Sequence, residues 1–356
     1  MRKKEHCEIE EQIQCWTKKC NLLERRVTMM QKEVIWPIGP CRFFTGTIQS
    51  VPIPCLADIF LAPQKGKVAI VTGGAKGIGY ETAKHLSRLG MHVIIAGNHK
   101  NQGQLSVSRI VQETGNEKVE FMFLELASMQ SIQQFAQNFK AKNLLLHVLV
   151  DNAAVMLVPQ RSTADGFEEH FGVNYLGHFL LTRLLLDTLR ESGSHDRNAR
   201  IITVSSATHY IGELNFNDLQ SRHHYSPHGA YAQSKLALVL FSYELQQRLT
   251  AEGSYVTSNV VDPGVVNTDL YKHTCWLFKL CKSLTSWLFF KTAAQGASTV
   301  IYAAVSPDLE GVGGSYLANG QKTKSADISY DADLQKKLWT QSCKLVGIPE
   351  WRQSNV

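Results

Sequence analysis

A phenol and an ammonium group, Tyr231 and Lys235, lie four residues apart in the sequence. In a helix this spacing places both side chains on one face, where the lysine cation stabilises the phenolate of the tyrosine. Such a pair can pass a proton to or from an alcohol oxygen at neutral pH. The spacing is unspecific by itself, because Tyr80 and Lys84 share it. We expect Tyr80 to pack or to face solvent, because it belongs to the helix that follows a glycine loop.

Two serines, Ser205 and Ser206, follow an apolar run at residues 200–204 that has the pattern of a buried strand. Ligands bind at the carboxyl ends of the strands of a parallel sheet. A serine hydroxyl at that edge can donate a hydrogen bond to a carbonyl oxygen while Tyr231 transfers the proton, as a carbonyl reduction requires. The alternation does not decide which serine faces the substrate, and a turn-capping role for both is the alternative.

A glycine-rich loop, TGGAKGIG at residues 72–79, follows the apolar run 68–71 and opens a helical pattern. Glycines allow a tight turn and the close approach of a pyrophosphate to the helix N-terminus. We therefore expect a dinucleotide site, with a purely structural turn as the alternative. The next apolar run ends near Asn98 without an acidic residue to bind the 2′-hydroxyl of NAD. Lys76 and Lys100 could reach a 2′-phosphate, which favours NADP without excluding NAD.

The elements that must position these groups alternate along the chain from residue 67 onward. Stretches with helical spacing, such as 81–89 and 177–189, separate short apolar runs. Six buried strands are predicted, at 68–71, 92–96, 119–124, 144–150, 200–204 and 256–261. Such alternation indicates right-handed βαβ units. We predict an α/β fold with a doubly wound, Rossmann-type parallel sheet, helices on both faces and a single catalytic domain.

Length and composition limit the class of protein. The 356 residues are 44% hydrophobic and 19% charged, which is typical of a globular protein. The net charge of +6 includes no run of five basic residues, so no nucleic acid partner is expected. The eight cysteines avoid the stretch between Cys55 and Cys275 and form no zinc-binding pattern, which predicts a reduced, cytosol-facing domain without a metal. The sequence contains no window of eighteen uncharged apolar residues, so no membrane span is predicted.

The first 63 residues differ from the rest of the chain. Apolar residues from Ile9 to Val34 recur at spacings of three and four, which favours an amphipathic helix that could pair as a coiled coil. We interpret residues 1–36 as such an arm and as a candidate contact of a homodimer, with a solvated helix or a poorly ordered extension as the alternative. Five prolines in 37–63 predict an irregular linker before the catalytic domain at 64–345.

Residues 270–291 contain no acidic residue, and four lysines are interleaved with tryptophan and leucine side chains. This pattern favours an amphipathic helix at a membrane interface. A helix pair that covers the pocket or is buried in a dimer is an equal alternative, because it too needs an apolar face. Either interpretation predicts an apolar lid and a lipophilic small-molecule substrate.

Together these residues resemble the short-chain dehydrogenase/reductase family, over about residues 67–317. The resemblance implies a catalytic tetrad of Asn174, Ser206, Tyr231 and Lys235. The contacts that it implies for NADP(H) or NAD(H) are Thr72, Gly73, Gly74, Lys76, Gly77, Ile78, Gly79, Asn98, Glu125, Asn152, Ala153, Tyr231, Lys235, Pro263, Gly264 and Thr268. Two elements depart from the family pattern. Asp151 and Ala154 stand where Asn and Gly are usual, and Glu125 replaces an aspartate.

Within the family, the runs HFLLT (178–182), VSSATH (204–209) and YAQSKLA (231–237) are similar to the retinol-dehydrogenase-like branch. The runs at 165–172 and 259–273 are similar to members of that branch that act on long polyisoprenoids. The resemblance implies NAD(P)-dependent oxidoreduction of a polyprenol or dolichol type of alcohol or aldehyde, at endoplasmic reticulum membranes or lipid droplets.

Three alternatives to this interpretation stay open. The substrate could be a retinoid or a steroid, and the protein could be cytoplasmic and soluble. In a different class of function, the chain would be a non-catalytic nucleotide-binding scaffold that acts through residues 1–36.

Overall fold

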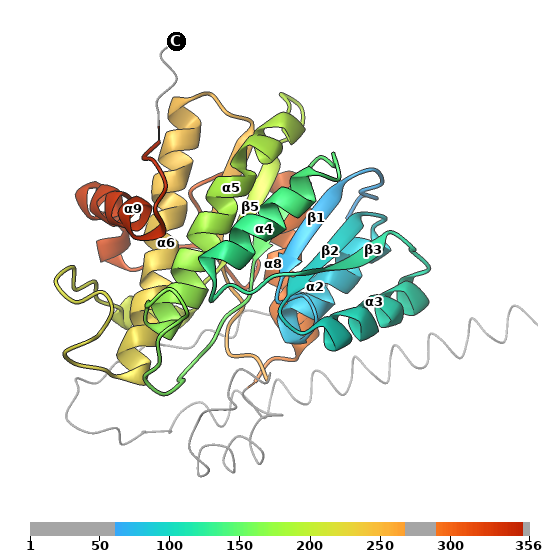
Figure 1. The fold of residues 1–356 in the computed structure, drawn as a ribbon. Helices are drawn as coiled ribbons and strands as arrows, with labels where there is room; N and C mark the ends of the chain where they lie inside the picture. The colour runs from blue at the N-terminus through green and yellow to red at the C-terminus, as the bar shows by residue number, and fades with distance from the viewer. Residues whose placement is uncertain (1–60, 268–289, 352–356) are drawn as a thin grey trace, which may run out of the picture. The chain divides into compact units, whose positions relative to one another are not determined.

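The strands of the computed structural model, which describes residues 61–267 and 290–351, form one sheet (Figure 1). They are β1 (Val68–Thr72), β2 (His92–Gly97), β3 (Val119–Phe123), β4 (Val148–Asp151), β5 (Ala199–Val204), β6 (Val256–Asp262), β7 (Tyr316–Ala318) and β8 (Gln321–Thr323). Their order is β3-β2-β1-β4-β5-β6-β7-β8, with β1 to β7 parallel and β8 antiparallel to β7. The chain crosses between β3 and β4, so the predicted doubly wound sheet is confirmed.

Helices cover both faces of this sheet (Figure 1). One face carries α2 (Gly77–Arg88), α3 (Lys100–Thr114) and α8 (Ala293–Val305). The other carries α4 (Met129–Lys140), α5 (Gly177–Ser192) and α6 (Pro227–Ala251), and α9 (Ala332–Val346) packs on α6. Short helical segments are η2 (His170–Leu176), η3 (Ala207–Ile211), η5 (Pro307–Leu309) and η6 (Asp327–Tyr330).

Successive residues of the central strands pack into opposite layers. Ile70 belongs to the apolar cluster shared with α4, α5 and α6, whereas Ala69 and Val71 belong to the cluster shared with α2 and α8. A parallel strand that is covered on both faces is expected to be largely apolar at successive positions. This is why β1 and β2 occur in the sequence as apolar runs, although the buried β6 also contains Thr257, Ser258 and Asn259.

Five of the six predicted strands agree with the structure to within one residue at each end. The fourth begins at Val148 instead of Leu144, because the ladder to β1 starts there and Leu146 donates its amide hydrogen to Ser192 Oγ instead (2.7 Å). Strands β7 and β8 were not predicted, because three residues are too few for a periodic signal. Asn319 and Gly320 form their turn with φ angles of +53° and +72°, the geometry of a tight hairpin.

Several predicted segments lie outside the described residues: the arm at 1–36, most of the linker at 37–63, and all but the end of the segment at 270–291. Among the residues that the structure describes, no helix is long and apolar enough to cross a membrane. The same residues include no cluster of three or more His, Cys, Asp or Glu side chains that could hold a metal ion.

The last residue of β4, Asp151, is a buried carboxyl group. Its Oδ2 accepts a hydrogen bond from Thr182 Oγ1 (2.9 Å), while Oδ1 has no partner within the described part of the chain. Burial raises the pKa of Asp151 from 3.8 to about 8. The carboxyl group therefore stays protonated in the folded protein at neutral pH, at a free-energy cost that an asparagine would not bear.

Replacing Asp151 with asparagine tests this account. Between pH 4 and pH 8 the unfolded chain has lost the proton that folded Asp151 retains, so the stability of the wild type falls as pH rises. Asp151→Asn should remove this dependence, and its advantage should grow by up to about 1.4 kcal/mol per pH unit before levelling above pH 8. Urea unfolding of both proteins at pH 5 and pH 8 measures the effect. A difference between them that does not change with pH would contradict the assignment.

Candidate active site

A cavity of about 1360 Å³ lies at the carboxyl ends of the parallel strands. It collects most of the residues predicted for the cofactor and for catalysis. The predicted residues that line it are Thr72, Gly73, Lys76, Gly77, Ile78, Gly79, Asn98, Glu125, Asn152, Ala153, Ser206, Tyr231, Lys235, Pro263 and Gly264. Gly74 and Asn174 are not in its wall, and Thr268 lies outside the described residues.

The glycine loop between β1 and α2 packs backbone against backbone. Gly73 has a φ angle of +64°, which a side chain would strain. A Cβ atom on Gly79 would lie 2.4 Å from the carbonyl oxygen of Gly73 and 2.6 Å from Asn152 Nδ2. The N-cap residue of α2, Lys76, makes no side-chain cap, and the first-turn amides of a helix have no intrahelical partner. This cradle fits a dinucleotide pyrophosphate, which those amides would bind.

The hydroxyl of Thr72 joins the loop to the neighbouring strand and helix. Its oxygen accepts hydrogen bonds from the amides of Asn152 (2.8 Å) and Ala153 (3.0 Å). The same oxygen lies 2.9 Å from His178 Nε2, and His178 Nδ1 lies 2.8 Å from the carbonyl oxygen of Asn174. Because a carbonyl only accepts, Nδ1 carries the hydrogen and Nε2 accepts the hydrogen of Thr72. Burial lowers the pKa of His178 to about 4, so the ring is neutral.

At the adenosine end, Asn98 and Glu125 bond to each other across the ends of β2 and β3, with Asn98 Nδ2 donating to Glu125 Oε2 (2.8 Å). Only one of the two lysines considered for a 2′-phosphate is in the wall of the cavity, namely Lys76. The ammonium group of Lys100 lies 5.6 Å from the ring centre of Phe123. The described residues therefore offer Lys76 as the cation for this end of the cofactor.

Tyr231 and Lys235 occupy the first half of α6 and are both buried. Lys235 Nζ donates a hydrogen bond to the carbonyl oxygen of Val204 (3.0 Å) and lies 5.7 Å from the ring centre of Tyr231. Burial lowers the pKa of Lys235 to about 8, although the carboxylate of Asp262 opposes the shift. At pH 7 the side chain is thus mainly a cation, next to the phenol that has to exchange a proton.

The structure separates the roles of the two serines, which the sequence left open. Ser205 is buried, and its Oγ donates to the carbonyl oxygen of Lys235 (2.9 Å). Both serines line the cavity, but Ser206 is half-buried there, and its Oγ accepts a hydrogen bond from the amide of Thr208 (3.3 Å). A hydroxyl that accepts this bond can still donate its own hydrogen to a substrate oxygen. Ser206 is thus the serine that fits the catalytic role.

Asn174 lies in the π-helical segment η2 and is fully buried. Its Oδ1 accepts from the amide of Val155 (2.8 Å), and its Nδ2 donates to the carbonyl oxygen of Val155 and to Ser234 Oγ (both 3.0 Å). The side chain therefore ties a loop to α6 and is already satisfied by these partners. Its membership of a catalytic tetrad stays a prediction.

The loop after β6, at residues 263–267, also lines the cavity. Asp262 Oδ1 accepts from the amide of Gly264 (2.8 Å), and Lys291 Nζ donates to the carbonyl oxygen of Pro263 (3.3 Å) and to Asn319 Oδ1 (2.7 Å). Lys291 is the last residue of the predicted amphipathic segment. Its half-buried ammonium group supports this loop instead of facing a membrane.

An apolar wall that was not predicted from the sequence lines the same cavity as the candidate catalytic groups. Beyond the predicted residues, the cavity is lined by Val155, Met156, Leu157, Val158, Val173, Ile211, His228 and Val265, among others. The signal was present for the loop at 155–158, because an apolar run directly follows Asn152 and Ala153 at the end of a strand. Val155 packs against the core and Val158 is buried, yet the whole run lines the cavity as well.

Comparisons with known proteins bear on this arrangement. The family model described as short chain dehydrogenase matches residues 67–275. The chain belongs to the short-chain dehydrogenase family. It is 65% identical to the polyprenol dehydrogenase of Homo sapiens over 80% of this chain and 87% of that protein. With retinol dehydrogenase 12 of Homo sapiens it shares 41% identity, over 86% and 92% of the two chains.

Among solved structures, a protein from Mycobacterium paratuberculosis is similar with a TM-score of 0.66 and 33% identity, covering 82% of this chain and 98% of that one. As a short-chain dehydrogenase, the protein is an NAD(P)-dependent oxidoreductase that acts on CH–OH groups. The predicted family, fold and cofactor class are thereby confirmed. The individual roles of the site residues are supported by the geometry alone.

Substitution of each serine tests the separation of their roles. Ser206→Ala removes a hydrogen-bond donor to the substrate oxygen, and kcat should fall about 10²- to 10³-fold with the cofactor affinity unchanged. Ser205→Ala instead removes the side-chain hydrogen bond to the carbonyl oxygen of Lys235. It should lower the free energy of unfolding by about 1 kcal/mol and affect kcat much less. Steady-state kinetics and thermal unfolding of both variants distinguish these outcomes, and a larger kcat loss in Ser205→Ala would reverse the assignment.

Proposed function

We propose that this short-chain dehydrogenase interconverts a long polyisoprenoid alcohol and its aldehyde, of the polyprenol or dolichol type. The observation that carries the proposal is the apolar loop at 155–158, which lines the same cavity as Ser206 and Tyr231. A chain of isoprene units has no polar group beyond its terminal oxygen, so it suits a wall without charged side chains. The similarity to polyprenol dehydrogenases from Homo sapiens and Danio rerio, at 65% and 58% identity, supports the same substrate class.

The site residues divide the work of the reaction. When bound, NAD(P)H supplies the hydride for reduction, and the oxidised form accepts it in the reverse direction. Ser206 donates a hydrogen bond to the carbonyl oxygen, and Tyr231 gives that oxygen its proton. The cation of Lys235 favours the phenolate that remains. The apolar wall excludes water from the carbonyl carbon and thereby strengthens these polar interactions.

A retinoid is the second candidate substrate. The similarity to retinol dehydrogenase 12 of Homo sapiens favours it, and a retinoid would suit the same apolar wall. We further propose NADP(H) as the preferred cofactor, because Lys76 lines the cavity and the residue directly after β2, Asn98, is not a carboxylate.

The Tyr231→Phe variant tests activity and substrate together. Purified full-length protein should reduce detergent-dispersed polyprenal with NADPH more efficiently than it reduces retinal, and NADH should serve less well. Tyr231→Phe should lose at least about 10²-fold in kcat, because it lacks the proton donor, while it binds NADPH as the wild type does. Cofactor binding without turnover of either aldehyde would favour a non-catalytic scaffold. A preference for retinal would favour the second candidate.

We also propose that the protein works at the cytosolic surface of endoplasmic reticulum membranes or lipid droplets, where a polyisoprenoid dissolves. The lysines interleaved with tryptophan and leucine at 270–291 support this location. Wild-type protein should float with vesicles of phosphatidylcholine and phosphatidylserine, and replacing Lys272, Lys279 and Lys282 with glutamate should abolish flotation without loss of folding. Equal flotation of the two proteins, or none by the wild type, would contradict the proposed location.

A further inference from the structure

The apolar wall of the substrate cavity is a loop that is held at both ends. At one end, the amide side chain of Asn174 pairs with both backbone polar groups of Val155. Between the ends, Leu157 has a φ angle of +53°, a left-handed conformation that residues with a side chain rarely adopt. A backbone in this conformation persists only where its surroundings fix it.

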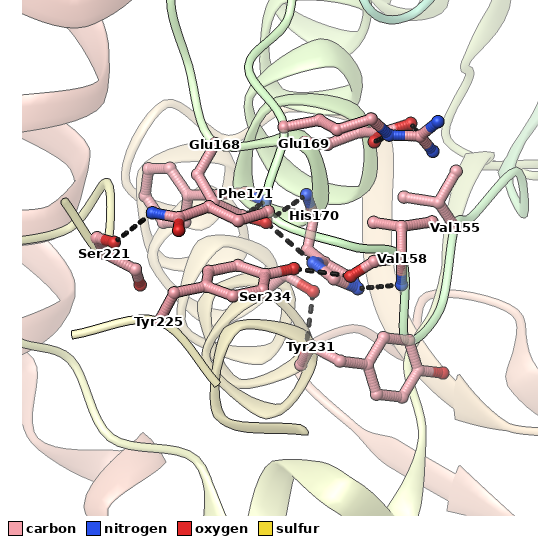
Figure 2. A network of polar contacts seen from close by, with 12 residues as sticks. Val155, Val158, Glu168, Glu169, His170, Phe171, Ser221, Tyr225, Tyr231 and Ser234 are labelled. Carbon is pink, nitrogen blue, oxygen red and sulfur yellow. Dashed lines mark hydrogen bonds and ion pairs between the residues drawn. The ribbon is translucent and has the colours of Figure 1, made fainter. Parts of the chain in front are cut away.

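At the other end, two side chains from different elements hold the backbone of Val158 (Figure 2). The amide of Val158 donates to His170 Nε2 (3.4 Å), and the carbonyl oxygen of Val158 accepts from the hydroxyl of Tyr225 (2.6 Å). Burial raises the pKa of Tyr225 to about 12, with the carboxylates of Glu168 and Glu169 adding to the effect. The phenol therefore remains a donor at any physiological pH.

His170 can accept this hydrogen bond because Glu168 fixes its tautomer. Glu168 Oε1 accepts from His170 Nδ1 (2.7 Å) and from the amide of His170 (2.9 Å), while its Oε2 accepts from the amide of Phe171 (2.7 Å). With its hydrogen on Nδ1, the ring directs a lone pair at Nε2 toward Val158. Both Glu168 and His170 are buried, so water cannot replace either partner.

The same imidazole ring packs against the catalytic tyrosine. The ring centres of His170 and Tyr231 lie 6.1 Å apart at an interplanar angle of 67°, an edge-to-face arrangement (Figure 2). One side chain thus contacts the proton donor through its ring and the substrate wall through its Nε2 atom. The distance between the wall and Tyr231 depends on where this ring is held.

We propose that His170, oriented by Glu168, is a positioning residue that holds the loop at 155–158 against Tyr231 and so sets the fit of the apolar substrate. Tyr225 supports the same loop through the carbonyl oxygen of Val158. The inference rests on the proposed function for the nature of the substrate. The placement of the loop itself requires only the contacts described above.

Two substitutions of His170 separate its two hydrogen bonds. Asparagine can still donate to Glu168 but does not reach Val158, whereas the longer glutamine can present an oxygen to the amide of Val158. Hydrogen exchange of the full-length protein, followed by mass spectrometry of peptides that span 153–160, reports on the loop without any substrate. Faster exchange of these peptides is expected in His170→Asn, and exchange close to that of the wild type in His170→Gln.

Kinetics with polyprenal and NADPH give the second measurement. His170→Asn should raise KM about tenfold and lower kcat less, with the Kd of NADPH unchanged, and His170→Gln should recover most of the KM. His195→Asn is the matched control, because the His195 side chain is 87% exposed and contacts Asp196 and Tyr255 instead of the loop at 155–158. If His170→Asn fails to fold, Tyr225→Phe should show the same exchange and KM effects in a milder form.

The results separate the two proposals. Absence of polyprenal turnover by the wild type would refute the substrate but not the positioning role, which the exchange data decide. Unchanged exchange in His170→Asn, or equal defects in the asparagine and glutamine variants, would overturn the role of the bond to Val158. A rise in the Kd of NADPH to match the rise in KM would overturn it too, because the defect would then not be confined to the substrate wall.

Discussion

The site depends on one buried hydroxyl group, that of Thr72 at the end of β1. Its oxygen accepts hydrogen bonds from the amides of Asn152 and Ala153, which follow β4, and the hydroxyl donates a hydrogen bond to His178 on α5. Because His178 uses its other nitrogen for the carbonyl oxygen of Asn174, its Nε2 is left to accept from Thr72, whose hydroxyl also lies within donating distance of the carbonyl oxygen of Val150 (3.2 Å). The glycine loop, the turn after β4 and the π-helical segment are therefore linked through this network.

Electrostatics at the catalytic edge follow from the same burial. The backbone carbonyl of Val204 accepts a hydrogen bond from the ammonium group of Lys235. The carboxylate of Asp262 favours the charged form of this lysine. Burial disfavours the charged form of Lys235, and the carboxylate of Asp262 opposes that effect. The ends of β5 and β6 thus place Ser206 in the cavity, and they also stabilise the charge of Lys235 next to Tyr231.

Much of this arrangement could be predicted from local patterns in the sequence. The strands of a covered parallel sheet are continuous apolar runs, and the turn at 72–79 needs glycine for reasons of backbone geometry alone. The roles of Ser205, Asn174 and the loop at 155–158 could not be predicted in this way. Each is decided by hydrogen bonds to residues 12 or more positions away, such as that from Ser205 to Lys235, and periodicity carries no information about such partners.

The two halves of the cavity are built by different means, and this difference bears on specificity. The cofactor half includes a glycine loop packed backbone against backbone, where an added side chain would clash, as the 2.4 Å contact at Gly79 illustrates. The substrate half is made of apolar side chains on a loop that polar residues hold from behind. Exchanging one apolar side chain for another there changes the shape of the cavity without touching the hydrogen bonds that Asn174, His170 and Tyr225 make to the backbone. The proposed role of the loop therefore separates the shape of the substrate wall from the catalytic groups, so that a change in one need not disturb the other.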